Sequence, residues 1–330
     1  MPIATHLSAL LAAWSAVVVV RVSSLPTRSQ STTDTRAADS DLDLDLDLDP
    51  NLNFSIPSAL TSSHLYGAPA NDFSCRSSPP RNPVVMLHGL SASRDVDLNL
   101  LQRELNGRGY CTFSLTYGAP HAVPAWVGGL GDMRRSAAQI ADFVREVRDR
   151  TTATGGARRR VDLVGHSEGG VQSLYVPLTQ AGVAGILEHV VALGPAVRGA
   201  TYFGFTDLWY IGGEATRALV GALADLLGCA ACEQLAPGGL VTEAFAAAER
   251  IAQGGNKVTI ITSAHDKLVP AAVSAVDEPG VRNVVVQTTC PDDGVGHAGL
   301  AWDKSVWRLV VNALEETDDE VYPCEMGLPF

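Results

Sequence analysis

The sequence predicts an α/β domain with a mostly parallel sheet that helices flank. From residue 80 onward, segments of strand character alternate with segments of helical periodicity, which is the pattern of repeated βαβ units. The strand segments are continuous runs of Val, Ile and Leu, as expected when both faces of a sheet are buried. With 330 residues, 46% of them hydrophobic and 18% charged, the chain is long enough to bury a sizeable core.

Six strands with right-handed crossovers between them are expected. They are Pro83–Leu87, Tyr110–Leu115, Val161–Gly165, Leu187–Leu193, Val258–Ser263 and Val281–Gln287. The helices expected between and after them are Leu98–Gly107, Asp132–Arg150, Gly169–Ala181, Glu214–Leu227, Thr242–Gln253 and Gly299–Glu315. Gly128–Gly131 precedes a helix but does not follow a strand, so no glycine-rich phosphate loop is predicted.

The N-terminal region is expected to lie outside the folded domain. Leu7–Val20 carries no charge and ends at Arg21, which is the length of the apolar part of a secretory signal and short for a membrane span. We therefore interpret residues 1–24 as a signal peptide, with an uncleaved anchor as the alternative. Residues 25–65 are acidic and rich in Ser, Thr and Asp, which predicts a disordered propeptide or linker. Within it, Asn53 begins an acceptor tripeptide for N-glycosylation.

Charge excludes one class of partner. The formal net charge is −12, and no basic run is present that would neutralise phosphates, so a nucleic-acid partner is not expected. About −5 of this charge belongs to residues 25–60, which hold seven aspartates and two arginines. Residues 66–330, the expected folded domain, are therefore only mildly acidic.

Six cysteines lie outside the signal segment, and an even number in a secreted chain favours disulfides over metal ligands. Fifteen pairings are conceivable. The expected one joins neighbours along the chain, in the pairs Cys75–Cys111, Cys229–Cys232 and Cys290–Cys324. No further Cys or His lies close enough in sequence to the middle pair to suggest zinc.

Residues 161–170 carry the strongest functional motif. An apolar strand leads into Gly165-His166-Ser167-Glu168-Gly169 and then into a helix, which is the context of a G-x-S-x-G nucleophile elbow. The two glycines are expected because side chains at those positions would collide with the adjoining strand and helix. Ser167 is therefore the predicted nucleophile.

A nucleophilic serine needs a base and an acid that orients the base. His297 is the predicted base, because it lies in a glycine-rich loop after the last strand and before the last helix. Asp266, just after the preceding strand, is the predicted acid and gives the chain order Ser, Asp, His. Asp292 and Asp293 are rivals for this role, but they are very close to His297 in sequence.

Main-chain amides are expected to bind the oxyanion, since they are fixed in place as charge develops. One is the amide of Glu168, the residue after the nucleophile, and the other is the amide of Leu90, in the loop after the first strand. His88 is expected to brace that loop. The Glu168 carboxylate would oppose an oxyanion unless it is turned away or paired.

Taken together, these segments resemble the secreted class 2 lipases and esterases of the α/β-hydrolase superfamily. The matching segments are Pro83–Leu90, Tyr110–Gly118, Val161–Gly170, Cys229–Gln234, Asp266–Pro270 and Cys290–His297. The resemblance implies an α/β-hydrolase fold and cofactor-independent hydrolysis of carboxylic esters, with an acyl-enzyme on Ser167. It also implies a lipid or small ester as substrate, with transient contact to a lipid interface and a monomeric state. The family's elbow usually has Gln where this chain has Glu168.

A helical cap is expected at about residues 198–250. Tyr202, Phe203 and Trp209 in this insert are expected to line an acyl pocket or a lid, or simply to pack the cap onto the sheet. Two other functions stay open at this point. One is an acyltransferase that uses the same triad, and the other is a weakly active or inactive hydrolase-fold binding protein.

Overall fold

Six parallel strands form the sheet, in the order β2-β1-β3-β4-β5-β6. The computed structural model describes residues 71–77, 81–119, 127–152, 159–200, 228–317, 320 and 322–325. The strands are β1 (Val84–Leu87), β2 (Thr112–Ser114), β3 (Val161–His166), β4 (Leu187–Leu193), β5 (Lys257–Thr262) and β6 (Val281–Val285). All neighbouring pairs are parallel, as the continuous apolar runs predicted.

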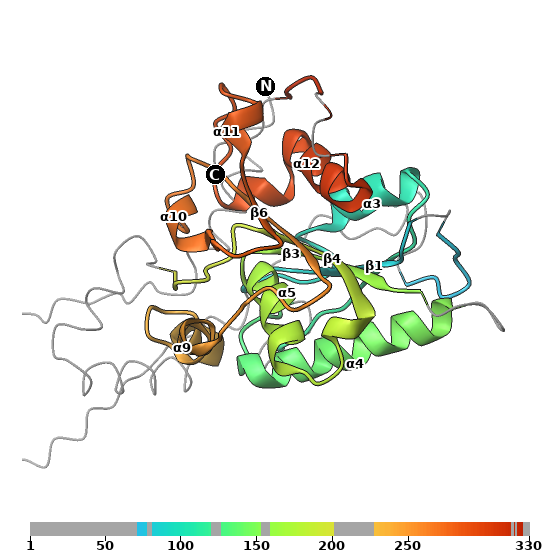
Figure 1. The fold of residues 1–330 in the computed structure, drawn as a ribbon, viewed down its shortest axis with the longest axis horizontal. Coiled ribbons are helices and arrows are strands. Elements are labelled where there is room, and N and C mark those ends of the chain that lie inside the picture. Colours follow the sequence, from blue (N-terminus) through green and yellow to red (C-terminus); the bar gives the residue numbers. More distant parts are fainter. Residues whose placement is uncertain are drawn as a thin grey trace, which may run out of the picture. The chain divides into compact units, whose positions relative to one another are not determined.

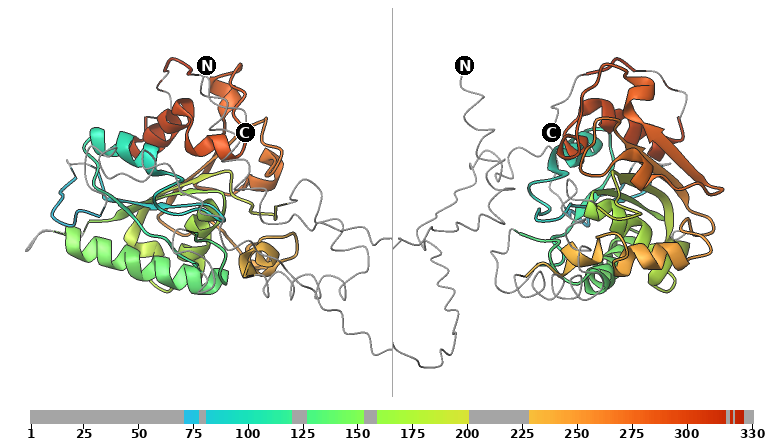
Figure 2. Two further views of the ribbon diagram at one scale, coloured as in Figure 1. Left: turned by 180° about the vertical axis from the view of Figure 1, so that it is seen from behind. Right: turned by 90° about the vertical axis from the view of Figure 1, so that its left-hand side faces the viewer.

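Helices cover both faces of the sheet (Figures 1 and 2). On one face lie α3 (Asn99–Gly107) and α12 (Lys304–Glu315), and on the other lie α4 (Met133–Thr151) and α5 (Glu168–Thr179). Each face has its own apolar core, one around α4 and α5 and one around α3 and α12. Because strand side chains alternate between the faces, Val85 and Leu87 enter the first core while Val84 and Met86 enter the second.

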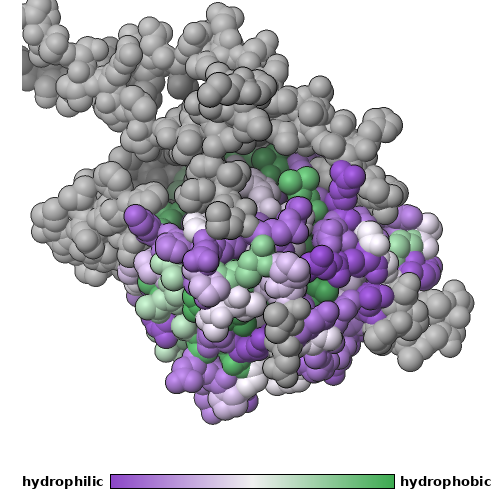
Figure 3. Space-filling view, turned by 90° about the horizontal axis from the view of Figure 1, so that it is seen from above, coloured by the Kyte–Doolittle hydropathy of each residue, from purple (hydrophilic) through white to green (hydrophobic). Residues whose placement is uncertain are grey.

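The shorter elements are found between these helices and near the ends of the strands. They are η2 (Ala184–Ile186), α8 (Ala230–Gln234), α9 (Leu240–Ala247), α10 (Ala271–Ser274), α11 (Val286–Thr289) and η4 (Ala298–Ala301). Viewed from above α11 and α12 of Figure 1, hydrophilic side chains cover most of the described surface, with smaller hydrophobic areas between them (Figure 3).

Two expected helices differ from the structure, and polar side chains explain both differences. The expected helix Thr242–Gln253 ends at Ala247 as α9. The Glu278 carboxylate accepts hydrogen bonds from the main-chain amides of Ile251 and Ala252, at 2.9 to 3.0 Å, and a continuing helix would need those amides for itself. The last helix is divided at Asp303, whose side chain accepts from the Val306 amide at 2.9 Å and caps α12.

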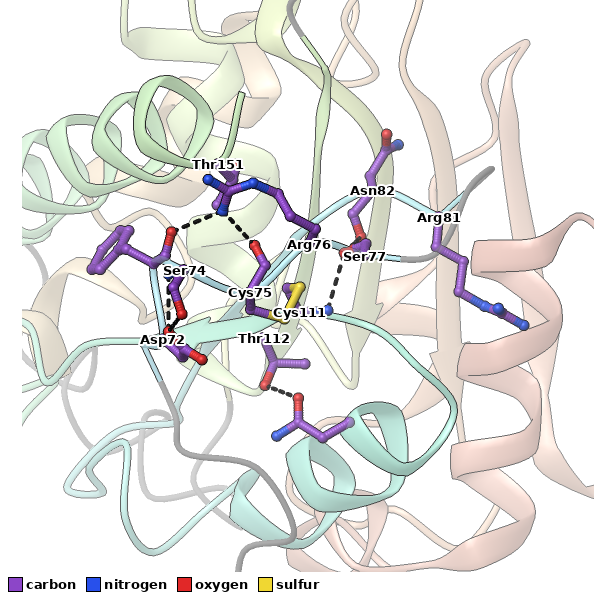
Figure 4. The surroundings of a disulfide bond; sticks show 12 residues. Asp72, Ser74, Cys75, Arg76, Ser77, Arg81, Asn82, Cys111, Thr112 and Thr151 are labelled. Atoms are coloured by element: carbon purple, nitrogen blue, oxygen red, sulfur yellow. Dashed lines mark hydrogen bonds between the residues drawn. A yellow bond between two sulfur atoms is a disulfide. The ribbon is translucent and has the colours of Figure 1, made fainter. Parts of the chain in front are cut away.

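The structure contains the three disulfides that the sequence predicts. Cys75–Cys111 joins the first described segment to the start of β2 (Figure 4). There, Ser77 also accepts a hydrogen bond from the Cys111 amide at 3.0 Å. Cys290–Cys324 ties the C-terminal segment to the residue after α11. Both bridges close loops of more than 30 residues, and such loops constrain the unfolded chain most.

Several predictions concern residues outside the described ranges. These are the signal peptide, the acidic propeptide or linker, Asn53 and the helix Glu214–Leu227. Within the described ranges, no helix has both the length and the apolar character that crossing a membrane requires.

Candidate active site

The three predicted catalytic residues lie at the same edge of the sheet. Ser167 follows β3, Asp266 lies four residues after the end of β5, and His297 lies in the loop beyond β6 and α11. Since the six described strands are parallel, their carboxyl ends meet at one edge, which is where sites in open α/β sheets form.

Ser167 sits on a sharp turn between β3 and α5. Its backbone has φ 55° and ψ −117°, a conformation that non-glycine residues adopt only under constraint. The constraint is the close packing of the two flanking glycines. A Cβ on Gly165 would lie 2.1 Å from the carbonyl oxygen of Gly169, and a Cβ on Gly169 would lie 2.1 Å from that of Leu87 in β1. Both glycines are therefore required by space, and the turn holds the serine out of the strand.

The serine, histidine and aspartate side chains form one hydrogen-bonded chain. His297 Nε2 lies 2.8 Å from Ser167 Oγ, and His297 Nδ1 lies 2.6 Å from Asp266 Oδ2. In the neutral histidine, a proton on Nδ1 facing the carboxylate leaves Nε2 as a lone pair facing the hydroxyl. This arrangement can take the proton from Ser167 when the oxygen attacks.

Two main-chain amides hold the Asp266 carboxylate in place. The amides of Leu268 and Val269 donate to Asp266 Oδ1 at 3.0 and 2.8 Å, which leaves Oδ2 for His297. Asp266 is only 4% exposed. Burial lowers the pKa of His297, although the Asp266 contact raises it, so the imidazole stays neutral and basic at neutral pH.

The loop after β1 lies directly beside the serine. A Cβ on Gly89 would lie 3.2 Å from Ser167 Cβ, and in the described part of the chain the Gly89 amide donates to Asp97 Oδ2 at 2.6 Å. For the amides of Leu90 and Glu168, no hydrogen bond to another described residue is found. Both amides are therefore free of other described partners, as the predicted role of oxyanion donor requires.

His88 holds this loop in shape. Its Nδ1 lies 2.8 Å from the Gly89 carbonyl oxygen, and its Nε2 accepts from the Tyr117 amide at 3.3 Å. The Tyr117 hydroxyl donates to the His88 carbonyl oxygen at 2.6 Å, and the two rings are stacked. Burial lowers the pKa of His88, so the residue acts as a neutral brace.

The Glu168 side chain is buried against the same loop. A Cβ on Gly129 would lie 2.2 Å from Glu168 Oε2 and 3.2 Å from Leu90 Cα. Glu168 is 2% exposed, and neither carboxyl oxygen has a hydrogen-bond partner among the described residues. Burial raises the pKa of Glu168 well above its usual value, so the group is neutral and places no negative charge beside the predicted oxyanion site.

Glu168→Gln is expected to stabilise the protein increasingly as the pH rises. A carboxyl whose pKa is raised by folding keeps its proton in the folded state after the unfolded state has lost it, so stability falls with rising pH between the two values. Glutamine does not ionise, so the variant lacks this pH-dependent loss of stability. The difference in unfolding free energy between the variant and the wild type should grow by up to about 1.4 kcal/mol per pH unit above the unfolded-state pKa.

Urea unfolding from pH 4 to pH 9 measures this difference. The exposed Glu249 provides the control variant Glu249→Gln, which makes the same chemical change on the surface. A Glu168→Gln difference that stays constant over the whole pH range would show that Glu168 ionises in the folded state as it does in the unfolded one.

The structure also reveals a buried pair that the sequence did not single out. His166, the residue before the serine, contacts Asp97 with its Nδ1 at 3.0 and 3.1 Å. Asp97 was not predicted as a site residue, because nothing in its local sequence separates it from other aspartates at a helix start. The cap aromatics Tyr202, Phe203 and Trp209 lie outside the described residues.

One cluster in the described chain has the side chains of a metal site. Ligand atoms of Glu188, His189 and Glu316 lie within 4.8 Å of one another. The Lys257 ammonium, however, hydrogen-bonds to Glu316 and lies 3.5 Å from Glu188. A lysine therefore already supplies the positive charge that these carboxylates need. The cluster lies at the amino ends of β4 and β5 and at the end of α12, away from the serine at the carboxyl edge.

Neither a protein-family model nor a curated protein sequence matches the chain. Solved structures do resemble it. A soluble variant of monoglyceride lipase from Saccharomyces cerevisiae is 13% identical, with 76% of this chain and 91% of that one covered and a TM-score of 0.53. A Bacillus licheniformis lipase in mature form is 20% identical over 66% of this chain and 87% of its own, with a TM-score of 0.47. A Paleococcus ferrophilus monoacylglycerol lipase is 16% identical over 73% and 96%, with a TM-score of 0.48.

At these identities a resemblance concerns the fold alone. The parallel six-stranded sheet, its helices on both faces and the agreement with the yeast enzyme's structure establish that fold. The chain has the α/β-hydrolase fold.

Proposed function

We propose that this protein is a secreted serine hydrolase that cleaves carboxylic esters through an acyl-enzyme on Ser167. The observation that carries the proposal is the continuous hydrogen-bonded chain from Ser167 Oγ through His297 to the buried Asp266. Geometry of this kind identifies a nucleophilic triad independently of the fold that carries it. The three disulfides support an extracellular location.

In the first half-reaction, Ser167 Oγ attacks the ester carbonyl carbon while His297 Nε2 takes the hydroxyl proton. The carbonyl oxygen becomes an oxyanion, which the Leu90 and Glu168 amides stabilise. The tetrahedral intermediate then collapses, the bond to the alkoxy oxygen breaks, and His297 gives its proton to the departing alcohol. Asp266 holds the imidazole in the required tautomer and stabilises the imidazolium while the proton is on it.

In the second half-reaction, water takes the place of the alcohol. His297 removes a proton from the water, the hydroxide oxygen attacks the acyl carbon, and collapse returns the proton to Ser167 Oγ with release of the carboxylic acid. The proposed substrates are acylglycerol-type or small esters. Their acyl chains are expected to contact the aromatic residues Tyr202, Phe203 and Trp209.

Hydrolysis of a short chromogenic ester tests this function, with a burst of alcohol release expected before the steady rate. A fluorophosphonate should label one residue, which peptide mass analysis should identify as Ser167, and Ser167→Ala should take no label. Rates over a series from soluble esters to emulsified triacylglycerols would distinguish an esterase from a lipase. Product analysis with an alcohol competing against water would reveal an acyltransferase, and wild-type protein with neither turnover nor label would contradict the proposal.

A further inference from the structure

A second buried aspartate–histidine pair lies behind the nucleophile. His166, the residue before Ser167, points its Nδ1 at the Asp97 carboxylate, 3.0 and 3.1 Å from the two oxygens. Its Nε2 lies 3.0 Å from the main-chain carbonyl oxygen of His297. His166 is 2% exposed and Asp97 is 5% exposed, so water does not compete for these contacts.

The partners of His166 fix its charge. A carboxylate and a carbonyl oxygen are both hydrogen-bond acceptors, so both ring nitrogens of His166 must donate, and only the imidazolium has two N–H groups. The Asp97 charge raises the pKa of His166 although burial lowers it, and His166 in turn lowers the pKa of Asp97. The raised pKa of His166 and the lowered pKa of Asp97 both agree with an ion pair inside the protein.

This pair connects three parts of the site that are far apart in sequence. Asp97 Oδ2 accepts from the Gly89 amide at 2.6 Å and so holds the loop that carries Leu90. His166 belongs to the turn that presents Ser167, and its Nε2 contacts the main chain of His297. In addition, the Trp302 indole donates to the Asp97 carbonyl oxygen at 2.9 Å. A shift of either loop would therefore break a charge-assisted hydrogen bond.

We propose that Asp97 and His166 form an imidazolium–carboxylate pair that positions the Leu90 loop and His297 around Ser167. They are positioning residues, since the pair acts through the Gly89 amide and the His297 carbonyl. The proposal rests on the proposed function, because positioning is measured through ester turnover. The protonation of the His166 ring can also be measured by NMR, which does not depend on turnover.

Truncation of the pair should lower turnover and leave substrate binding nearly unchanged. Asp97→Ala leaves the Gly89 amide and the His166 Nδ1 without their acceptor. The Leu90 loop therefore loses a fixed contact, and the His166 ring that contacts the His297 main chain is no longer held from its other side. Displacements of about 1 Å at such positions cost on the order of 100-fold in rate. We expect kcat to fall about 100-fold for Asp97→Ala, with KM within about twofold of the wild type.

Asp97→Asn separates the role of charge from that of geometry. The asparagine oxygen can accept from Gly89 and its amide can donate to His166 Nδ1, while a neutral His166 still donates from Nε2 to the His297 carbonyl. The network survives without its charges. We expect kcat for Asp97→Asn to fall less than about tenfold. The isosteric variant should therefore keep most of the turnover that Asp97→Ala loses.

The loss of charge should also appear in the pH profile. His166 lowers the pKa of His297 and Asp97 raises it less, so removing both charges raises the pKa of the base. A base works only when it is neutral, so the acidic limb of kcat/KM should move to higher pH. The other titratable groups facing the pair, unchanged in this variant, are Asp266, His297, His88 and Tyr117.

The chain offers a matched control at the opposite edge of the sheet. Asp162 Oδ1 lies 3.0 Å from His189 Nδ1, and both residues are buried. Asp162 is the second residue of β3, and His189 lies near the start of β4. The pair is therefore at the amino ends of the strands, away from Ser167. Asp162→Ala therefore breaks a buried aspartate–histidine pair of the same kind, and we expect its kcat per folded molecule to stay within about twofold of the wild type.

Nitrogen NMR of the wild-type protein, labelled at its histidines, detects directly which ring nitrogens of His166 carry protons. We expect both ring nitrogens of His166 to carry protons at pH 7 to 8, and one of them to lose its proton in Asp97→Asn. This measurement stays valid if Asp97→Ala fails to fold. If the wild type has no turnover and takes no phosphonate label, the proposed function fails, while a doubly protonated His166 in the same sample would still support the pair.

Three results would overturn the inference. One is a folded Asp97→Ala variant with kcat within about threefold of the wild type. Another is an Asp97→Asn variant whose acidic limb does not move. The third is a His166 that carries a single ring proton in the wild type.

Discussion

Asp266→Asn is expected to lower kcat about 10⁴-fold and to change KM little. The amides of Leu268 and Val269 donate to Asp266 Oδ1, so the asparagine oxygen will occupy that position and accept from them. Its NH₂ group then replaces Asp266 Oδ2 and donates to His297 Nδ1. The histidine proton must move to Nε2, where it faces Ser167 Oγ and prevents Nε2 from taking the serine proton. A tautomer change of this kind in a serine-protease triad costs about 10⁴ in kcat.

Asp293→Asn is the matched control for this variant. Asp293 is as buried as Asp266, and its Oδ1 accepts from the Val295 amide at 3.0 Å in the loop that carries His297. Within the described part of the chain, the Asp293 side chain makes no hydrogen bond to His297. Steady-state kinetics should show a large loss for Asp266→Asn and a loss of less than about threefold for Asp293→Asn. The opposite ranking would assign the orienting role to Asp293.

Gly169→Ala is expected to prevent stable folding. The added Cβ would lie 2.1 Å from the carbonyl oxygen of Leu87 and 2.6 Å from that of His88. Both atoms are main chain, held by the sheet and the Leu90 loop, so neither can move aside as a flexible side chain would. We expect the free energy of unfolding to fall by about 4 kcal/mol or more, a large part of the total for a typical domain.

Gly107→Ala provides the comparison, since a Cβ there meets no atom within 4 Å and the residue ends α3. Alanine favours helix by up to about 1 kcal/mol over glycine, so this variant should be as stable as the wild type or slightly more stable. Denaturant unfolding and soluble yield measure both variants. A Gly169→Ala protein within about 1 kcal/mol of the wild type would mean that the strand and helix can separate at the elbow.

Much of the fold and the candidate site could be predicted from the sequence because the signals are local. All six predicted strands are present, since most contain a short run of Val, Ile or Leu and all of them alternate with helical segments. Ser167, Asp266 and His297 could be selected because each follows a strand in an order that one parallel sheet brings to one edge. The end of α9 and the start of α12 could not be predicted. Glu278, which is distant in sequence, binds the main-chain amides that follow α9, and Asp303 caps α12 within a segment whose pattern is helical throughout.

By itself, the sequence determined the succession of the six strands and of the longer helices that the structure describes, the glycine spacing at the elbow, the pairing of the cysteines and the three residues of the candidate triad. Only the tertiary structure decided how Asp97, His166 and Glu168 behave. A carboxyl group or an imidazole takes its charge from the groups around it and from its burial, and chain segments far apart in sequence supply both. Asp97 becomes an anion beside His166, whereas Glu168, pressed against Gly129 with no partner among the described residues, keeps its proton.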